Sequence, residues 1–196
     1  MIPKLTFRYS TVYDRRYRDS KGLREKMEKK SIMYPSHKKI RDYIKKVDPL
    51  WRKIEKQVFS EISKITGLKW NQKEVICYVI GYGRPFSDPL TMKIFDKKDD
   101  FIDTLVHECI HQIQVQNRNI NKRWVKYIGK KYPKESRVTR NHIFIHAIHE
   151  KVYLKLFSEK RLKHELKIRK NEDYIRAWEI VKEEGADNLI KVLRKL

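Results

Sequence analysis

Hydrophobic residues recur along most of the chain with the spacing of amphipathic helices. After an initial stretch of polar residues, a short helix is indicated over 36–47. A second helix is indicated by apolar residues that follow one another every three or four positions, at Leu50, Ile54, Val58, Ile62 and Ile65. Asp48 with Pro49 is a helix-start pattern, and Gly67 is a typical helix end. We therefore predict that the second helix begins at Pro49 and ends before Gly67.

The pattern changes after residue 74. The run VICYVI, followed by Gly81 and Gly83, has the composition of a buried strand. The turn-forming residues RPFSDP separate it from LTMKIF, a second candidate strand. We expect these two strands to form a hairpin. Residues 1–35 are mostly polar, and we expect a loosely ordered segment there, a loop and a solvated helix.

Helical spacing resumes in the second half of the chain. A helix should start in the acidic run DKKDD, capped by Asp99 or Asp100, and continue through FIDTLVHECIHQIQVQ. A long helix is predicted over about 138–158. Asn171 should cap another helix that stops at Gly185, before a short final helix. The sequence thus predicts an α+β fold, mostly helical with a small sheet, as one domain over residues 1–196 with a core at 74–157 and C-terminal helices at 158–196.

The strongest chemical signal is the motif His-Glu-x-x-His at residues 107–111. Residues four apart lie on one face of a helix, so His107 and His111 can bind one zinc ion. Glu108 can then act as general base on a metal-bound water. Composition predicts about 0.02 such motifs by chance, so coincidence is a weak explanation. On a helical wheel both histidines face away from the apolar side, where Cys109 lies as a small buried residue.

A second group of histidines lies on the predicted helix over 138–158. His142, His146, His149 and Tyr153 fall on one stripe, flanked on both sides by apolar residues. Three imidazoles and a phenol on a buried face need polar partners. A metal site with its surrounding hydrogen bonds would satisfy them, and so would a structural polar cluster.

The His-Glu-x-x-His helix after a β-hairpin, followed by a separate downstream helix with further ligands, resembles the zincin metallopeptidases and within them the gluzincins. The resemblance covers roughly residues 74–157. It implies a zincin-like fold, one zinc ion per chain, and a substrate peptide held along the edge strand before the motif helix. The counterpart of that strand here is Thr91, Met92, Lys93, Ile94 and Phe95.

The third ligand departs from the family pattern, in which a glutamate binds the metal and a carboxylate follows one turn later. Our preferred assignment is His146 as ligand with Glu150 as the carboxylate that orients a histidine. Glu150 itself, His142 or His149 are the alternatives. Tyr153 or His142 would then stabilise the oxyanion during hydrolysis of a peptide or protein substrate.

Charge adds a competing interpretation. The 196 residues include 47 Lys and Arg against 25 Asp and Glu, a net charge of +22. A nucleic acid or another polyanion is therefore a second candidate partner, with YDRRYR and NKRWVKYIGKKY mixing aromatic and basic residues. In that case the chain would be a basic nucleic-acid-binding protein with a structural or vestigial metal site. A zincin that only makes protein contacts is a third possibility.

The cysteines and the apolar runs bear on location. Cys77 and Cys109 are too few for a disulfide framework, which favours a reducing compartment. The N-terminus has no signal-peptide core, and VICYVI is too short to cross a membrane. We therefore expect a soluble, cytoplasmic protein without membrane contacts.

Overall fold

A computed structural model describes residues 1–168 and 171–196. This described part contains ten helices and four strands, which confirms the mostly helical α+β fold. It divides into two compact units. Unit 1 comprises residues 1–2, 57–71 and 109–196, and unit 2 comprises residues 3–56 and 72–108.

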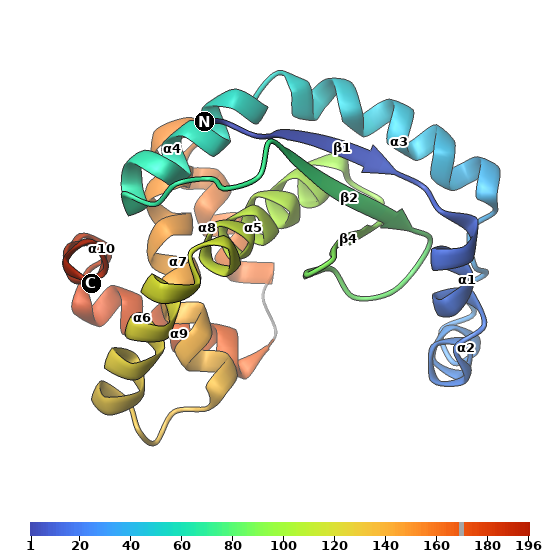
Figure 1. Cartoon of the computed structure of the whole chain (residues 1–196). Coiled ribbons are helices and arrows are strands. Elements are labelled where there is room, and N and C mark those ends of the chain that lie inside the picture. The colour runs from blue at the N-terminus through green and yellow to red at the C-terminus, as the bar shows by residue number, and fades with distance from the viewer. Residues whose placement is uncertain (169–170) are drawn as a thin grey trace. The chain divides into compact units, whose positions relative to one another are not determined.

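Unit 2 is built on a four-stranded sheet with the order β1-β2-β4-β3 (Figure 1). Its strands are β1 (Lys4–Arg8), β2 (Glu74–Ile80), β3 (Phe86–Ser87) and β4 (Leu90–Lys93). The expected hairpin between the VICYVI and LTMKIF segments is wrong, because β2 and β4 pair in parallel, with Tyr78 opposite Thr91. The antiparallel pairing is instead the short one between β3 and β4. The segment between β2 and β4 therefore carries the chain back so that β4 starts at the same end of the sheet as β2. It does not form a tight turn between two antiparallel strands.

The N-terminal segment is more regular than its polar composition suggests. β1 pairs in parallel with β2, and Leu5 of β1 is fully buried. Helices α1 (Thr11–Arg18) and α2 (Lys21–Glu28) follow. Residues 1–35 thus contain mostly exposed helices, in keeping with the expected solvated helix, but also the strand β1, which was not predicted. A strand of five residues has too little alternation to stand out from one sequence, and its pairing partner is about 70 positions away.

The boundary predicted at Pro49 is also wrong. Helix α3 (His37–Arg52) runs through Pro49, and α4 (Glu55–Thr66) begins three residues after α3 ends. The end of α4 at Gly67 is as predicted, and Gly67 has a φ of 73°. A proline near the end of a helix forfeits one backbone hydrogen bond, a smaller loss than in the interior when packing favours continuation.

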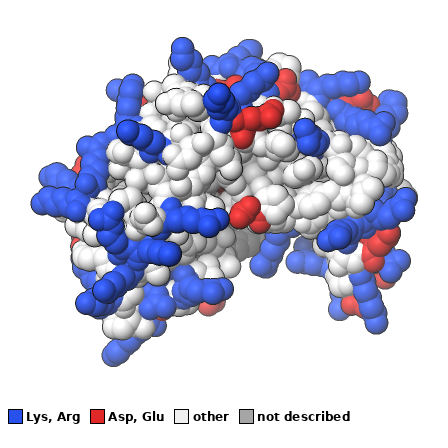
Figure 2. Space-filling model, viewed as in Figure 1, with Lys and Arg blue, Asp and Glu red and all other residues white. Residues whose placement is uncertain are grey.

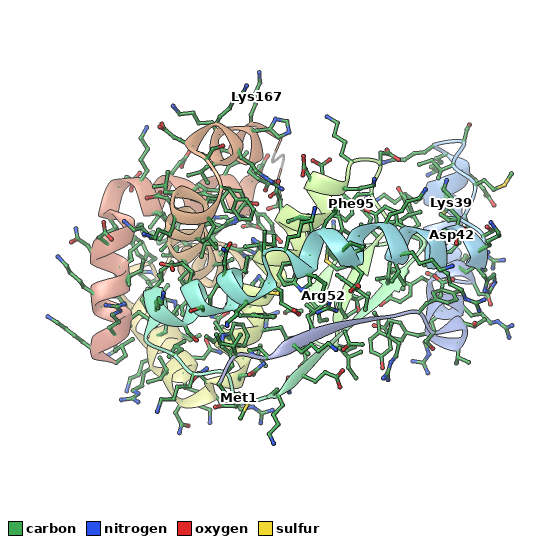
Figure 3. The ribbon with its side chains drawn as sticks, turned by 90° about the horizontal axis from the view of Figure 1, so that it is seen from above. Met1, Lys39, Asp42, Arg52, Phe95 and Lys167 are labelled. Carbon is green, nitrogen blue, oxygen red and sulfur yellow. The ribbon has the colours of Figure 1, made fainter. Side chains whose placement is uncertain are left out.

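The side chains at the α3–α4 junction hold the exposed edge of β1. Arg52 donates to the Leu5 carbonyl oxygen at 2.6 Å, and Glu55 Oε1 accepts from the Leu5 N–H at 2.6 Å. Arg52 and Glu55 also form an ion pair with each other at 2.7 Å. Figure 3 shows Arg52 on this side of α3, whereas Lys39 and Asp42 lie nearer its other end. The two side chains thus take the hydrogen-bonding place of a neighbouring strand at Leu5 and blunt that edge.

Asp14 is a fully buried carboxylate inside unit 2. Its Oδ1 accepts from the Tyr34 hydroxyl at 2.6 Å and from the Gly81 N–H at 3.0 Å. Its Oδ2 accepts from Tyr9 at 3.2 Å and pairs with Arg18 at 3.3 Å. Gly81 has no room for a side chain, because a Cβ there would lie 2.5 Å from the Tyr34 ring. The carboxylate therefore joins α1, the end of β2 and the segment before α3.

Unit 1 is helical and centred on α7 (Arg137–Leu156), which α9 (Glu172–Glu184) and α10 (Ala186–Lys195) flank (Figure 1). Its other helices are most of α4, the second half of α5 (Lys98–Gln116), α6 (Arg118–Lys131) and α8 (Glu159–Ile168). The predicted cap of α9 is confirmed, since the Asn171 side chain accepts from the Tyr174 N–H. The predicted stop at Gly185 is also confirmed. α7 is buried on nearly every side from His142 to His149.

Among the described residues, no helix is long and apolar enough to cross a membrane. Lys and Arg side chains are spread over the visible face, with acidic side chains between some of them (Figure 2). The net charge of +22 is therefore not gathered in one place on this face.

Candidate metal centre

Helix α5 presents the two motif histidines on one side, as the sequence predicts. The helix begins at Lys98, so Asp99 and Asp100 lie in its first turn and neither is the cap. His107 is 3% exposed and His111 9%. The division between the units falls between residues 108 and 109, inside this continuous helix. The spacing of the two histidines is therefore set by α5 itself.

His142 of α7 completes the cluster. One ring nitrogen from each of His107, His111 and His142 lies within 4.8 Å of the others. The His111 and His142 ring centroids are 5.2 Å apart, and the rings are nearly perpendicular. Three nitrogen donors this close together can hold one metal ion. Among the described residues, these three histidines form the one group of at least three histidine, cysteine or carboxylate side chains whose ligand atoms lie this close together.

The structure thus brings His142, one of the alternatives, and not the preferred His146 into the cluster with the two motif histidines. His146 lies one helical turn further along α7, about 6 Å in rise. It is fully buried, and its ring stacks on Trp178 of α9, with centroids 4.3 Å apart and an angle of 11°. Both histidines lie on the same stripe of α7, and the packing of α7 against α5 selects the earlier one.

Hydrogen bonding and burial prepare these histidines for a metal. His142 Nδ1 lies 2.8 Å from the Val138 carbonyl oxygen, so it carries the proton and Nε2 carries the lone pair. Burial, and next the nearby His142, lower the pKa of His111 to about 3. A neutral imidazole is the form that binds a metal, and His111 is neutral at physiological pH.

Two residues that the sequence analysis did not assign to the site support the cluster. The Gln114 side chain hydrogen-bonds His111 and donates from Nε2 to Asn121 at 2.9 Å and to Asn141 at 3.2 Å. The ring of Tyr174 lies against that of His142, with centroids 4.0 Å apart. Gln114 falls on the same wheel face as His107, which is a signal that sequence could have used. Tyr174 looks like any other inward residue of an amphipathic helix.

Glu108 is buried in unit 2, beside β2. Burial raises the pKa of the Cys77 thiol, and the negative charge of Glu108 raises it further. The carboxylate therefore lies near Cys77 in the middle of β2. Cys109 is fully buried, as predicted.

The structure does not bring the other predicted residues into the cluster. His149 and Tyr153 are fully buried, with ring centroids 4.3 Å apart, and Tyr153 also packs on Phe157. Tyr153 lies about 16 Å along α7 from His142, which excludes it as an oxyanion donor at this cluster. Glu150 is half-buried, and burial raises its pKa, with Asp187 adding to the shift.

The predicted substrate edge needs a second correction. β4 ends at Lys93, so Ile94 and Phe95 lie beyond it. β3 pairs with β4 at Leu90 and Thr91, which places β3 at the edge of the sheet. Met92 and Lys93 continue past β3 and pair with β2 on their other side. Within the predicted segment, therefore, only Met92 and Lys93 belong to β4 without being paired to β3.

No protein-family model, curated protein or solved structure matches this chain. The chemistry of the cluster must therefore be argued from its own donors. Three imidazoles that are buried together, with His142 held by a backbone carbonyl and His111 by an amide side chain, are typical ligands of zinc and of neighbouring transition metals.

Proposed function

We propose that the chain is a zinc-dependent metallopeptidase, with His107, His111 and His142 as ligands. The observation that carries this proposal is the convergence of His142 on the two motif histidines. Three protein nitrogens leave one position of a tetrahedral zinc site for water or substrate, which is the composition of catalytic zinc sites. The glutamate next to the first ligand adds a base. The two buried thiols, which form no disulfide, fit a cytoplasmic location.

The residues of the chain have distinct roles in this mechanism. When bound, zinc would polarise the attacking water and the scissile carbonyl group. Glu108 takes the proton from that water and passes it to the leaving amine. Gln114 and the Val138 carbonyl hold the rings of His111 and His142 in place. Burial lowers the pKa of His111 and keeps this ligand neutral.

The variant Glu108→Gln tests the proposal. It keeps the shape of the side chain and removes the base, so we expect unchanged zinc content and a loss of peptide hydrolysis of at least about 100-fold. Zinc is measured by elemental mass spectrometry, and hydrolysis by mass spectrometry of a mixed peptide library. Glu150→Gln is the matched control, and it should retain both zinc and activity.

Three outcomes would contradict the proposal or its set of ligands. Wild-type protein that binds zinc but cleaves no peptide would point to a structural or vestigial site. Full activity of Glu108→Gln would exclude Glu108 as the base. Loss of zinc in Glu150→Gln would return that residue to the set of ligands.

A second candidate function is polyanion binding on α6. This helix carries six basic residues and no acidic one: Arg118, Lys122, Arg123, Lys126, Lys130 and Lys131. Lys131 is paired with Glu184, and Trp124 is buried. Trp124 is therefore not available to stack on bases, whereas Tyr127 of the same helix is half-exposed. Contacts of the basic side chains with backbone phosphates would weaken steeply with salt.

Binding of a labelled single-stranded oligonucleotide at increasing salt tests this candidate. Reversing two exposed charges, Lys122→Glu with Lys126→Glu, should weaken binding at least about tenfold and reduce the salt dependence. Lys38→Glu with Lys45→Glu on α3 is the control of equal charge change. Equal losses in both pairs would show a diffuse charge effect, and no binding at low salt would exclude the function.

A further inference from the structure

A cavity of about 540 Å³ lies in unit 1 between α6 and the first turns of α7. Its apolar walls are Trp124, Val125, Ile128 and Val138, and His142 is part of its lining. The candidate third ligand therefore belongs to the cavity and to the metal cluster at once. A cavity of this size holds a large side chain together with its backbone atoms.

Two of the four apolar wall residues are open to solvent, whereas Trp124 and Ile128 are buried. Val125 is 56% exposed and Val138 40% exposed, and both line this cavity. Apolar side chains gathered in a concave, accessible place are typical of a ligand pocket. A ligand that covers them would remove apolar surface from water, and this favours an apolar or aromatic group in the cavity.

Two cations complete the lining. Arg137 and Arg140 of the first turn of α7 line the cavity, and within residues 1–168 and 171–196 neither forms an ion pair. A guanidinium group pairs with a carboxylate through two parallel hydrogen bonds. The cavity therefore combines an apolar interior with charge complementary to a carboxylate.

Hydrogen bonds from Gln114 of α5 connect the two helices that form the cavity. Asn141 belongs to its lining and accepts a hydrogen bond from Gln114, which also bonds Asn121 of α6. The same Gln114 hydrogen-bonds His111. One side chain thus links both walls of the cavity to the metal cluster, which gives a bound group a fixed position relative to the histidines.

We propose that this cavity binds the C-terminal residue of a peptide whose last side chain is large and apolar. The side chain enters between Trp124 and Val138, and the terminal carboxylate pairs with Arg137 and Arg140. The preceding peptide bond then lies toward His142. The binding step is independent of the proposed function, whereas cleavage of that bond rests on it.

Gly129 offers a precise way to test the cavity. It lines the cavity on α6, and a Cβ built there meets no heavy atom within 4 Å. Gly129→Leu therefore has room for its Cβ and adds a bulky side chain to the cavity lining, and replacing a helical glycine favours the helix. Gly22 on α2 is an equally open helical glycine in unit 2, and Gly22→Leu is the matched control.

The experiment is calorimetric titration of the full chain with N-acetyl-L-phenylalanine. We expect saturable binding that weakens at least tenfold for N-acetyl-L-phenylalanine amide and for N-acetyl-L-alanine. Gly129→Leu, and separately Arg137→Gln with Arg140→Gln, should weaken it at least tenfold, and Gly22→Leu should not change it. Equal binding of the acid and the amide would overturn the proposal, as would wild-type affinity in Gly129→Leu. A change in oligomeric state alone, seen by sedimentation, would make the cavity an interface between copies and would also overturn it.

A second measurement separates this proposal from the peptidase proposal. Zinc-loaded protein is incubated with peptides that end in Phe or Ala, and the released residue is detected by mass spectrometry. Selective binding without cleavage would leave the pocket standing and contradict the peptidase. Cleavage without preference for a C-terminal Phe would support the peptidase and overturn the pocket.

Discussion

Asp14 in unit 2 and the histidine cluster on α5 and α7 are both buried and polar, but they are organised in opposite ways. Asp14 is surrounded by donors, namely two tyrosine hydroxyls, a backbone N–H and Arg18. The three histidines instead bring ring nitrogens to within 4.8 Å of one another, and proximity to His142 helps to lower the pKa of His111. Gln114 and the Val138 carbonyl bond two of these rings, but the converging nitrogens can in addition share one ligand that accepts lone pairs. The contrast separates a structural polar group from a candidate binding site.

The largest expected effect distinguishes His142 from His146. His142→Gln should weaken zinc binding by more than about 100-fold, because it removes a ligand and not an outer partner. His146→Gln, one turn away and also buried, should leave zinc affinity within about threefold of wild type. Competition with a fluorescent chelator measures both. The reverse result would restore His146 as the ligand.

Asp14→Asn should destabilise unit 2 whether or not metal is present. The charge that pairs with Arg18 is lost while its buried donors remain, and we expect a loss of about 2.5 kcal/mol. Urea unfolding with and without chelator measures it. The exposed Asp42, which pairs with Lys38 and Lys45 on α3, is the control, and Asp42→Asn should cause no measurable change. If Asp14→Asn lowered stability only when zinc is present, Asp14 and the histidine cluster would be coupled, and the contrast between them would not hold.

Acidification should destabilise the metal-free protein through His111. Its pKa is about 3 in the fold and about 6.5 in an unfolded chain, so the unfolded state binds more protons below pH 6.5. Stability should therefore fall by about 2 kcal/mol from pH 7 to pH 5 and continue to fall toward pH 3. Urea unfolding of wild type and His111→Gln in chelator measures the difference. His164→Gln on the exposed side of α8 should keep the wild-type slope, and an unchanged slope in His111→Gln would contradict the account.

The smallest effect concerns Gln114, which holds His111 without binding metal. Gln114→Ala should reduce zinc affinity about tenfold and keep one zinc per chain at saturation. Gln116→Ala, two residues later on α5, should leave it unchanged. Wild-type affinity in Gln114→Ala would show that α5 alone positions His111.

Sequence predicted what depends on neighbours along the chain. The motif helix, the Asn171 cap and the stop at Gly185 follow from spacing and capping within a few residues. β1 and the parallel pairing of β2 with β4 were missed, because partners far along the chain decide them. The helix boundary at Pro49 was wrong for a similar reason, since packing carried α3 past a local start signal.

The candidate site divides along the same line. His107, Glu108 and His111 lie within one helix, so their spacing is visible in the sequence. On α7, His142 and His146 lie on the same stripe, and only the packing of α7 on α5 decides between them. Glu150 was chosen because it follows His146 by one turn, and neither residue belongs to the cluster of His107, His111 and His142.

Both thiols of the chain are fully buried, and this makes site-specific labelling simple. The pKa of Cys77 is raised, so that thiol is a poor nucleophile at neutral pH. A cysteine introduced at Gly129 would be the accessible one and would take a fluorophore or a spin label selectively. A reporter fixed there would sense the arrival of any molecule between α6 and α7, without requiring catalysis.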